Sequence, residues 1–525
     1  MSGTAPPFAS TRAPGAMVAS ADQLATQAGM WALANGGNAV DAAITTNAAI
    51  AVTAPHLCGM GGDLFALVHV DGKVHALNSS GRAGSGSDSA ALRAEGMTEM
   101  PFRNDIRTVT MPGCVSGWQA LHDTFGTLSM SDVLAPAIEL AEGGFPASPL
   151  LVGSVNMLDD RGRAAMHELV EQAHRPGDLV RRPGAARALR SIAEHGKDGF
   201  YLGEFGRGLL ELGNGLYDHE DLRALPEWVQ PLSRAAFGKI LHTMPPNSQG
   251  YLTIAAAALA DRLGLPADPN DPQWAHLLIE AATVAAHDRP QVLHDSADGN
   301  ALVDRIVADM ALVNPTRASR RMAPTSDGDT TYLCTVDRAR MGVSLIQSNA
   351  AGFGSGLVEP NTQINLHNRG LGFSIERGHP AELLPGRRPP HTLSPAMATN
   401  ADGSLAAAFG TMGGDGQPQI LLQIAARLFL HGEGPASAIS AGRWLLHGPT
   451  TGFDTWTAAE GPHVIVEGHI AAEWVDGLER RGHEVRVVAP WDSGFGHAHA
   501  IIVEPGGTLA GAADPRARIG SVAGL

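Results

Sequence analysis

Hydrophobic and polar positions divide the chain into helical and strand-like segments. From residue 17 to 54 the apolar positions recur at helical spacing, and this predicts a helix capped by Ser20 and ended by Asn35-Gly36-Gly37. A second helix is expected near Val40-Asp41. Phe65–Val70 and Lys73–Leu77, joined by Asp71-Gly72, have the signal of a two-residue hairpin.

The middle of the chain and its last third differ in their pattern of apolar positions. Residues from about 131 to 320 are rich in helical segments, clearest at Ala135–Ala141, Ala185–His195, Thr253–Leu263 and His276–His287. The last third has short β-branched or alternating runs, at Thr331–Val336, Gly342–Gln347, Leu405–Phe409, His463–Val466, Glu484–Val488 and Ala500–Val503. The pattern alone therefore predicts a layered protein of mixed helices and strands.

Length and charge narrow the class of protein. The chain has 525 residues, of which 44% are hydrophobic and 17% charged, enough for a large core. Apolar runs such as Leu252–Ala260 are far shorter than the roughly 20 residues of a membrane span. The first residues lack the layout of a secretory signal, so a cytoplasmic location is expected. A net charge of −16 argues against nucleic acid or an anionic membrane as a partner.

Cysteine and histidine usage gives no metal or disulfide signature. Cys58, Cys114 and Cys334 are too few and too far apart for a disulfide framework, and we expect three buried thiols. His497 and His499 form the tightest histidine pair, but alternating histidines favour a strand over a metal site. We expect no metal and no cofactor.

Thr330 stands between a polar loop and a β-run. Residues 325–329 read Thr-Ser-Asp-Gly-Asp, a turn-forming segment expected to be exposed and mobile. If the bond after Asp329 breaks, Thr330 acquires a free α-amine that can take the proton of its own hydroxyl, directly or through water. The alternative is that Thr330-Thr331 simply suits the start of a strand.

Motifs along nearly the whole chain favour the first interpretation, in which Thr330 is a nucleophile. They are Ala16–Ala43, Gly59–Asp63, Met111–Val115, Pro245–Gly250, Phe353–Gly356, Ser394-Pro395 and Gly410–Gly414. Together they resemble the γ-glutamyltransferase family of N-terminal nucleophile hydrolases, and Leu366–Ser374 resembles a cytoplasmic-type branch that includes oxamate amidohydrolase-like members.

The resemblance implies a fold, a cleavage and a set of roles. It implies an α+β fold, a four-layer αββα sandwich with strands from both mature chains. It implies cleavage between Asp329 and Thr330 into a large chain, 1–329, and a small chain, 330–525, that stay together, and it leaves open a homodimer of such pairs. Ser348 takes the place of a family Thr that bonds the nucleophile's amine, and the amides of Gly413 and Gly414 would hold the oxyanion.

The residues that bind substrate in the family have changed. Ala350, Arg369 and Gly372 stand where an Asn, a Gln and an Asp normally grip a free amino-acid end, so a cation replaces an acid. The family's carboxylate-binding Arg is matched by Arg82, two residues late. His391 and Thr392 replace a Ser pair.

These observations predict an autoprocessing amide hydrolase with an acyl-Thr330 intermediate, acting on γ-glutamyl or related small-molecule amides. Hydrolysis is preferred over transfer, because the sequence shows no acceptor site that would exclude water. One alternative is an oxamate-type amidohydrolase or acylase that binds an anion through Arg82 and Arg369. Another is an unprocessed, non-catalytic binding homologue.

Overall fold

Two antiparallel seven-stranded sheets form the centre of the computed structural model, which describes residues 8–319, 329–447 and 463–525. The strand order is β1-β20-β19-β15-β14-β9-β8 in sheet A and β21-β2-β10-β11-β3-β4-β7 in sheet B. Their strands are β1 (Thr11–Ala13), β2 (Met17–Ser20), β3 (Asp63–Val70), β4 (Lys73–Ser79), β7 (Glu227–Val229), β8 (Leu232–Ala236), β9 (Lys239–Thr243), β10 (Asp329–Val336), β11 (Gly342–Ala350), β14 (Ala396–Thr399), β15 (Leu405–Thr411), β19 (Ala498–Val503), β20 (Leu509–Ala513) and β21 (Ser521–Gly524).

Three small sheets complete the strands, and the helices gather in two groups. The small sheets contain β5 (Phe145–Pro146), β6 (Leu179–Val180), β12 (Val358–Glu359), β13 (Ile364–Asn365), β16 (Trp444–His447), β17 (His463–Glu467) and β18 (Val485–Val488). The helices are α1 (Gln23–Ala34), α2 (Ala39–Thr53), α3 (Ser89–Ala94), α4 (Cys114–Phe125), α5 (Met130–Gly143), α6 (Pro149–Asn156), α7 (Asp160–Ala165), α8 (His167–Val170), α9 (Pro183–His195), α10 (Lys197–Tyr201), α11 (Glu204–Gly213), α12 (Tyr251–Leu263), α13 (Pro272–Ala286), α14 (Arg289–Val292), α15 (Gly299–Ala308), α16 (Gln417–Ala425), α17 (Pro435–Ser440) and α18 (Ala472–Arg480).

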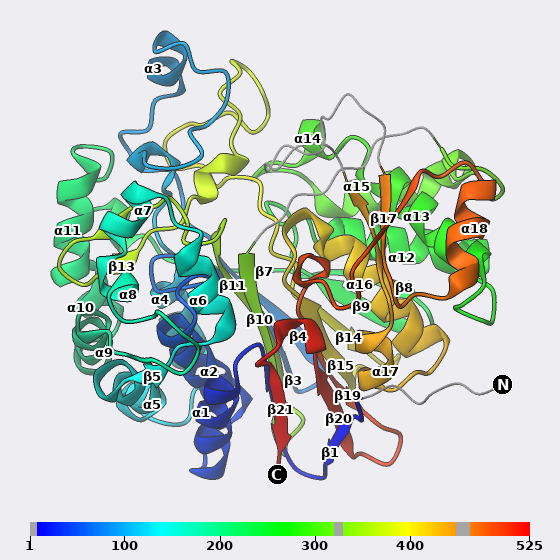
Figure 1. Ribbon diagram of the computed structural model, residues 1–525, viewed down its shortest axis with the longest axis horizontal. Helices are drawn as coiled ribbons and strands as arrows, with labels where there is room; N and C mark the ends of the chain where they lie inside the picture. The colour runs from blue at the N-terminus through cyan, green and yellow to red at the C-terminus, as the bar shows by residue number, and fades with distance from the viewer. Residues whose placement is uncertain (1–7, 320–328, 448–462) are drawn as a thin grey trace.

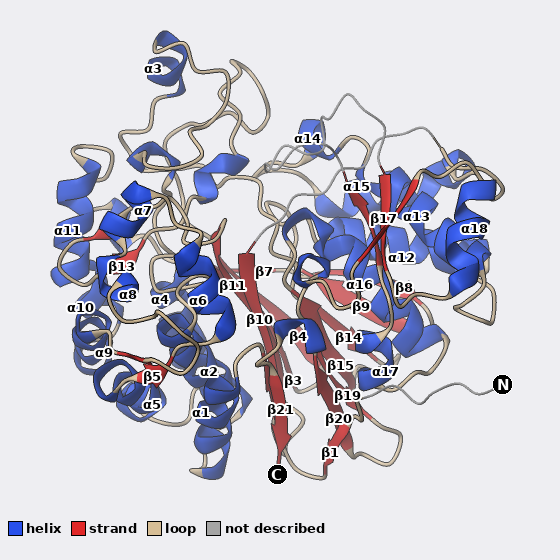
Figure 2. Ribbon diagram, in the orientation of Figure 1, coloured by secondary structure: helices blue, strands red, loops and turns tan. Residues whose placement is uncertain are grey.

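The hydrophobic core divides along these layers. Side chains of both sheets meet in one cluster, with Leu67 and Tyr332 of sheet B against Met397 and Ile501 of sheet A. A second cluster joins the other face of sheet B to α1, α2, α4, α5 and α9. A third joins the other face of sheet A to α12, α13 and α16. Figures 1 and 2 show the strands in the middle of the molecule with one helical group on either side.

Most predicted elements are present, and one cap was placed wrongly. The hairpin joins β3 and β4 through Asp71 and Gly72, both at positive φ. The first helix is capped by Asp22, not by Ser20, because the Asp22 carboxylate accepts the N–H groups of Leu24 and Ala25. Ser20 ends β2 instead. All three cysteines are buried free thiols.

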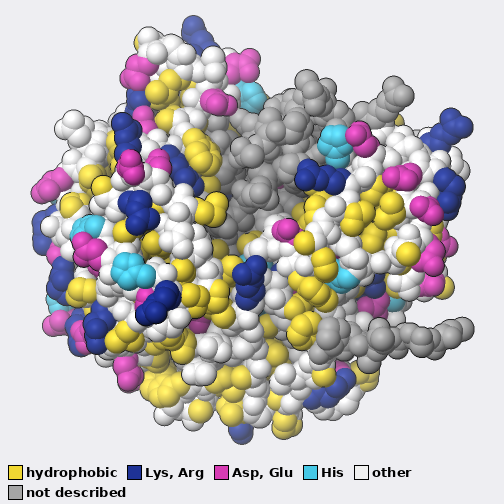
Figure 3. All heavy atoms as spheres, in the orientation of Figure 1, with side chains coloured by type: hydrophobic (Ala, Val, Ile, Leu, Met, Phe, Trp, Pro, Cys, Tyr) yellow, Lys and Arg dark blue, Asp and Glu magenta, His cyan; other side chains and the backbone are white. Residues whose placement is uncertain are grey.

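The remaining expectations concern a histidine pair, a turn before Thr330 and the absence of a membrane-spanning helix. His499 lies in β19 and His497 just before it, both buried. Residues 325–328, predicted to form an exposed mobile turn, lie outside the described residues. Among the described helices none is long and apolar enough to cross a membrane. Figure 3 shows cationic and anionic side chains intermixed over one face of the molecule.

A buried ion network ties the residues after β20 to the small sheet of β16, β17 and β18. Asp514 pairs with Arg443 at 2.6 Å and with Arg516 at 3.1 Å, and Arg516 also pairs with Glu467. Burial would raise the pKa of Asp514, but the two guanidinium groups hold the pKa well below its usual range.

Asp514→Asn is expected to lower the free energy of unfolding by about 3–5 kcal/mol, because it leaves two buried cations with a single carboxylate. Since the folded-state pKa is depressed, this stabilisation is present above the unfolded pKa of about 4 and is lost as the pH falls below it. Urea unfolding at neutral pH and at pH about 3 measures both effects. Asp304→Asn, at an ion pair whose Asp304 side chain is 67% exposed, is the control and should cost about 1 kcal/mol or less.

Candidate active site

Thr330 is held at the start of β10 against the neighbouring strand. Its side chain is buried, and its Oγ1 donates to Ser348 Oγ of β11 at 3.1 Å. The register shifts here: Asp329 faces Ala350 and Thr331 faces Gln347, so Thr330 opposes two residues of β11. This bulge re-aims the Ser348 side chain toward Thr330, as bulges beside active sites commonly do.

Arg369 reaches the same hydroxyl from a short 3-10 turn, η4 (Arg369–Gly372). Its Nη2 lies 3.4 Å from Ser348 Oγ, and its Nη1 donates to Thr392 Oγ1 at 3.1 Å. The side chain is fully buried, which lowers the pKa of Arg369 to about 10, while Asp63 and Asp415 oppose that decrease. Arg369 therefore remains a cation at neutral pH, two hydrogen-bond steps from Thr330.

Gly413 and Gly414 follow β15 and lead into α16 through η5 (Gly414–Gly416). Their φ values are 133° and 50°, in the region that favours glycine. In the described part of the chain neither N–H group has a hydrogen-bond acceptor, as an oxyanion-binding pair requires. Gln249 Nε2 donates to the carbonyl oxygens of both Thr392 and Gly414 at 3.0 Å. One chain of contacts thus runs from Thr330 to the carbonyl oxygen of Gly414.

His391 is turned away from this chain of contacts. Its Nε2 lies 3.0 Å from Asp63 Oδ2, and its Nδ1 accepts the N–H of Leu393, so Nε2 carries the proton. Burial and the nearby Arg369 lower the pKa of His391 to about 3. Burial would raise the pKa of Asp63, but the neighbouring His367 and His391 hold that pKa below its usual value. His391 is therefore neutral at physiological pH, and it precedes Thr392 in the chain.

Arg82 is not brought to Thr330. Its guanidinium pairs with Glu227 at 2.6 Å and Asp295 at 3.5 Å, and it donates to the carbonyl oxygen of Gly386. Arg82 lies two residues after the position of the family's Arg, and its side chain is at the surface, 33% exposed. Of the cations and hydroxyls predicted to bind substrate, Arg369 and Thr392 lie within the chain of contacts that starts at Thr330.

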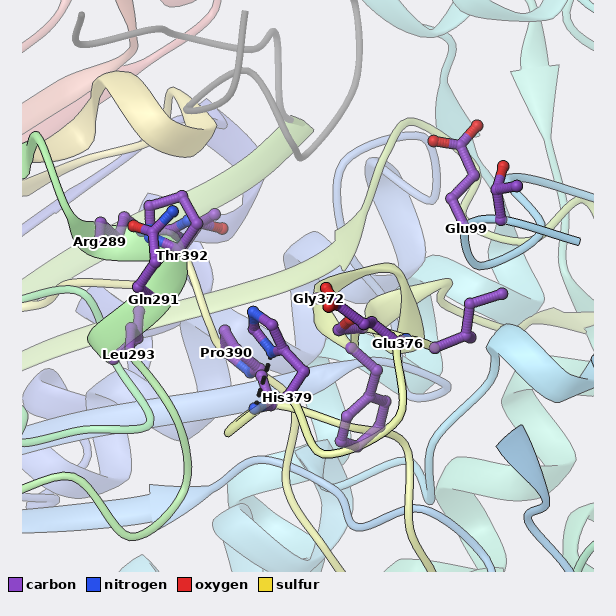
Figure 4. Close-up of a pocket in the computed structure, with 15 residues that line it drawn as sticks. Glu99, Arg289, Gln291, Leu293, Gly372, Glu376, His379, Pro390 and Thr392 are labelled. Carbon is purple, nitrogen blue, oxygen red and sulfur yellow. Dashed lines mark hydrogen bonds between the residues drawn. The ribbon is translucent and has the colours of Figure 1, made fainter. Parts of the chain in front are cut away.

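Four neighbours of this site were not predicted as site residues. Asp63 and His367 form a buried cluster with His391, and Asp415 pairs with Arg289 at 3.4 Å. Asp63 and Asp415 adjoin the glycine-rich motifs, which was a usable signal, whereas Arg289 lies in no motif. Arg289 and Thr392 also line a cavity of about 260 Å³. Figure 4 shows these two on one side of the cavity, Glu99 on the other, and His379 between them.

A buried Thr hydroxyl lies at a strand start beside a Ser hydroxyl, and hydrogen bonds link them to a cation and a glycine pair. This arrangement fits an enzyme of the N-terminal nucleophile type. The chain belongs to the gamma-glutamyltranspeptidase family, whose model matches residues 25–524.

Similar proteins align with almost the whole chain. It is 35% identical to an oxamate amidohydrolase proenzyme of Klebsiella pneumoniae, over 97% of this chain and 98% of that one. It is 33% identical to the glutathione hydrolase-like YwrD proenzyme of Bacillus subtilis, over 95% and 97%. The crystal structure of a cephalosporin acylase from Bacillus halodurans, 33% identical, superposes with a TM-score of 0.89 over 100% of this chain and 98% of that one.

Proposed function

We propose that this protein is a self-processing amide hydrolase whose nucleophile is Thr330, with Ser348, Gly413 and Gly414 as its machinery and Arg369 and Thr392 as substrate ligands. The observation that carries the proposal is the buried Thr330 hydroxyl, 3.1 Å from Ser348 Oγ. In this proposal residues 1–329 become a large chain and residues 330–525 a small chain. The two sheets between two helical groups would then be the four-layer αββα sandwich of N-terminal nucleophile hydrolases.

Maturation follows from the same hydroxyl. Thr330 Oγ attacks the carbonyl carbon of Asp329, the peptide C–N bond breaks, and the nitrogen takes a proton, leaving an ester. Water then hydrolyses the ester, giving a carboxylate on Asp329, the regenerated hydroxyl and a free α-amine on Thr330. In turnover that amine accepts the hydroxyl proton while Thr330 attacks the substrate amide, and the glycine amides stabilise the tetrahedral oxyanion.

The position of Arg369 favours an acyl group with a carboxylate close to the scissile carbonyl. Because Arg369 Nη2 contacts the Ser348 hydroxyl that also bonds Thr330, an anion on this guanidinium lies near the attacked carbon. Oxamate, named for the Klebsiella relative, has its carboxylate directly on that carbon. We therefore favour a short anionic amide as substrate.

A γ-glutamyl amide is the second candidate, supported by the relative named as glutathione hydrolase-like. Three carbons separate its α-carboxylate from the scissile carbonyl, and its ammonium needs an acceptor. Ala350 and Gly372 stand where the family resemblance places an Asn and an Asp, and neither offers a side-chain acceptor. Turnover of oxamate, a glutaryl amide and γ-glutamyl-p-nitroanilide by one preparation separates the two candidates.

Processing is the direct test of the proposal. On denaturing electrophoresis we expect the 54.6 kDa chain to be replaced by two fragments, and mass spectrometry should place the new N-terminus at Thr330. A single full-length band that persists on incubation without amidase activity would indicate a binding homologue. A single band with activity would assign the nucleophile to another residue.

A further inference from the structure

Three side chains with metal-binding atoms lie close together in the helical group that packs against sheet A. His276 and Glu280 lie one turn apart on α13, on the same face of the helix, and His483 follows α18. Their ligand atoms all lie within 4.8 Å of one another. His276 and Glu280 are buried and His483 is partly buried, so the group is a defined cluster of the interior.

Hydrogen bonds orient each of these groups. His276 Nε2 lies 2.9 Å from the carbonyl oxygen of Asn314 and so carries the proton, which leaves Nδ1 to accept the Nε2–H of His483, 2.8 Å away. A bound ion would take the place of that proton, and the neutral His483 would then carry its proton on Nδ1. A histidine whose second nitrogen donates to a carbonyl is the usual arrangement of a metal ligand. Glu280 Oε1 accepts the N–H of Ser319 at 2.9 Å, which fixes its carboxylate.

Arg481 is a cation two residues before His483, and other groups hold it. Its guanidinium donates to Gln273 Oε1 and to the carbonyl oxygen of Gly477.

We propose that His276, Glu280 and His483 bind one divalent transition-metal ion, Zn²⁺ by their donor set, in a site separate from the catalytic group. Two imidazoles and a carboxylate are a common Zn²⁺ ligand set, with water in the fourth position. Nitrogens on one tetrahedral Zn²⁺ are about 3.3 Å apart, so the histidine pair needs to open only slightly from its 2.8 Å contact.

The ion would link segments on both sides of the cleavage before Thr330. His276 and Glu280 precede it, and His483 follows it. The segment that frames the cluster, from Asn314 to Ser319, is already fastened to the later part of the chain, because Ala318 N–H donates to the Arg481 carbonyl at 2.8 Å. A bound ion would therefore hold the end of the large chain against the small chain.

The test uses the full protein, stripped of metal with a chelator, with Zn²⁺ as titrant in calorimetry and Co²⁺ as a spectroscopic probe. We expect one Zn²⁺ per protein, a tetrahedral Co²⁺ absorption, and a Tm that rises with Zn²⁺ concentration. His276→Ala and His483→Ala should weaken binding more than about 100-fold, and Glu280→Gln more than about 10-fold with the shape of the site kept. His219→Ala, at an exposed histidine outside the cluster, should bind as the unchanged protein does.

The readout does not depend on amidase activity, so its failure and the failure of the proposed function are distinguishable. Absence of Zn²⁺ binding by the unchanged protein overturns the site. Equal binding by His276→Ala and the unchanged protein also overturns it, because the ion would then sit elsewhere. If an alanine variant does not fold, the Glu280→Gln titration decides by the same criterion.

Discussion

A Thr330→Ala protein is expected to remain a single chain of 54.6 kDa and to lose amide hydrolysis by about 10⁴-fold or more. The substitution removes the hydroxyl that attacks the Asp329 carbonyl, and without that attack the α-amine that serves as base is never released. Electrophoresis after prolonged incubation and the initial rate of amide hydrolysis measure both losses in one preparation.

Two neighbouring variants make this result specific. Thr330→Ser keeps a hydroxyl and should still be cleaved. Thr331→Val removes the adjacent hydroxyl, which is buried and has no hydrogen-bond partner among the described residues, and keeps the side-chain shape, so cleavage should continue. A Thr330→Ala protein that is cut at the same bond would refute the assignment of the nucleophile.

Replacing Arg369 by Lys should lower kcat/KM for oxamate by about 100-fold, equivalent to about 2.7 kcal/mol, mainly through a higher KM. Lysine keeps the buried positive charge near Asp63 and Asp415 but loses the planar fork that holds a carboxylate with two hydrogen bonds. Hydrolysis of a neutral amide such as acetamide should change little. Steady-state kinetics with both substrates separates the two effects.

Arg82→Lys is the matched control for Arg369. The sequence assigned both arginines to substrate binding, but Arg82 is held by Glu227 and Asp295 at the surface. Its substitution should leave KM for oxamate unchanged. If Arg369→Lys lowers the rates with oxamate and with the neutral amide equally, Arg369 supports the fold of the site and does not select the anion.

Local patterns predicted the elements well where the signal lay within a few residues. The β3–β4 hairpin followed from Asp71-Gly72 between apolar runs, and α12 and α13 from their periodicity. The cap of α1 was misplaced by two residues, since Ser20 and Asp22 both suit a cap and only tertiary pairing shows that Ser20 completes β2.

Some residues of the candidate site could be predicted from the sequence, and others could not. Thr330, Ser348 and Arg369 could be proposed from sequence, because they lie on adjacent strands or a nearby turn at family spacing. The pairing of Arg289 with Asp415 joins segments far apart in the chain, as does that of His391 with Asp63, and no spacing rule reports such contacts. The surface partners of Arg82 were hidden for the same reason.

Strands from before and after Thr330 alternate within both large sheets. In sheet B, β10 and β11 lie between β2 and β3, and in sheet A, β14, β15, β19 and β20 lie between β9 and β1. If the bond before Thr330 is cut, neither piece can leave without exposing the backbone of several strands of its partner. Maturation would thus be a one-way event: the intact chain folds as one molecule, whereas the cut enzyme, once denatured, would have to recover by the meeting of two separate chains. Its working life would then be governed by its rate of unfolding and not by a reversible equilibrium.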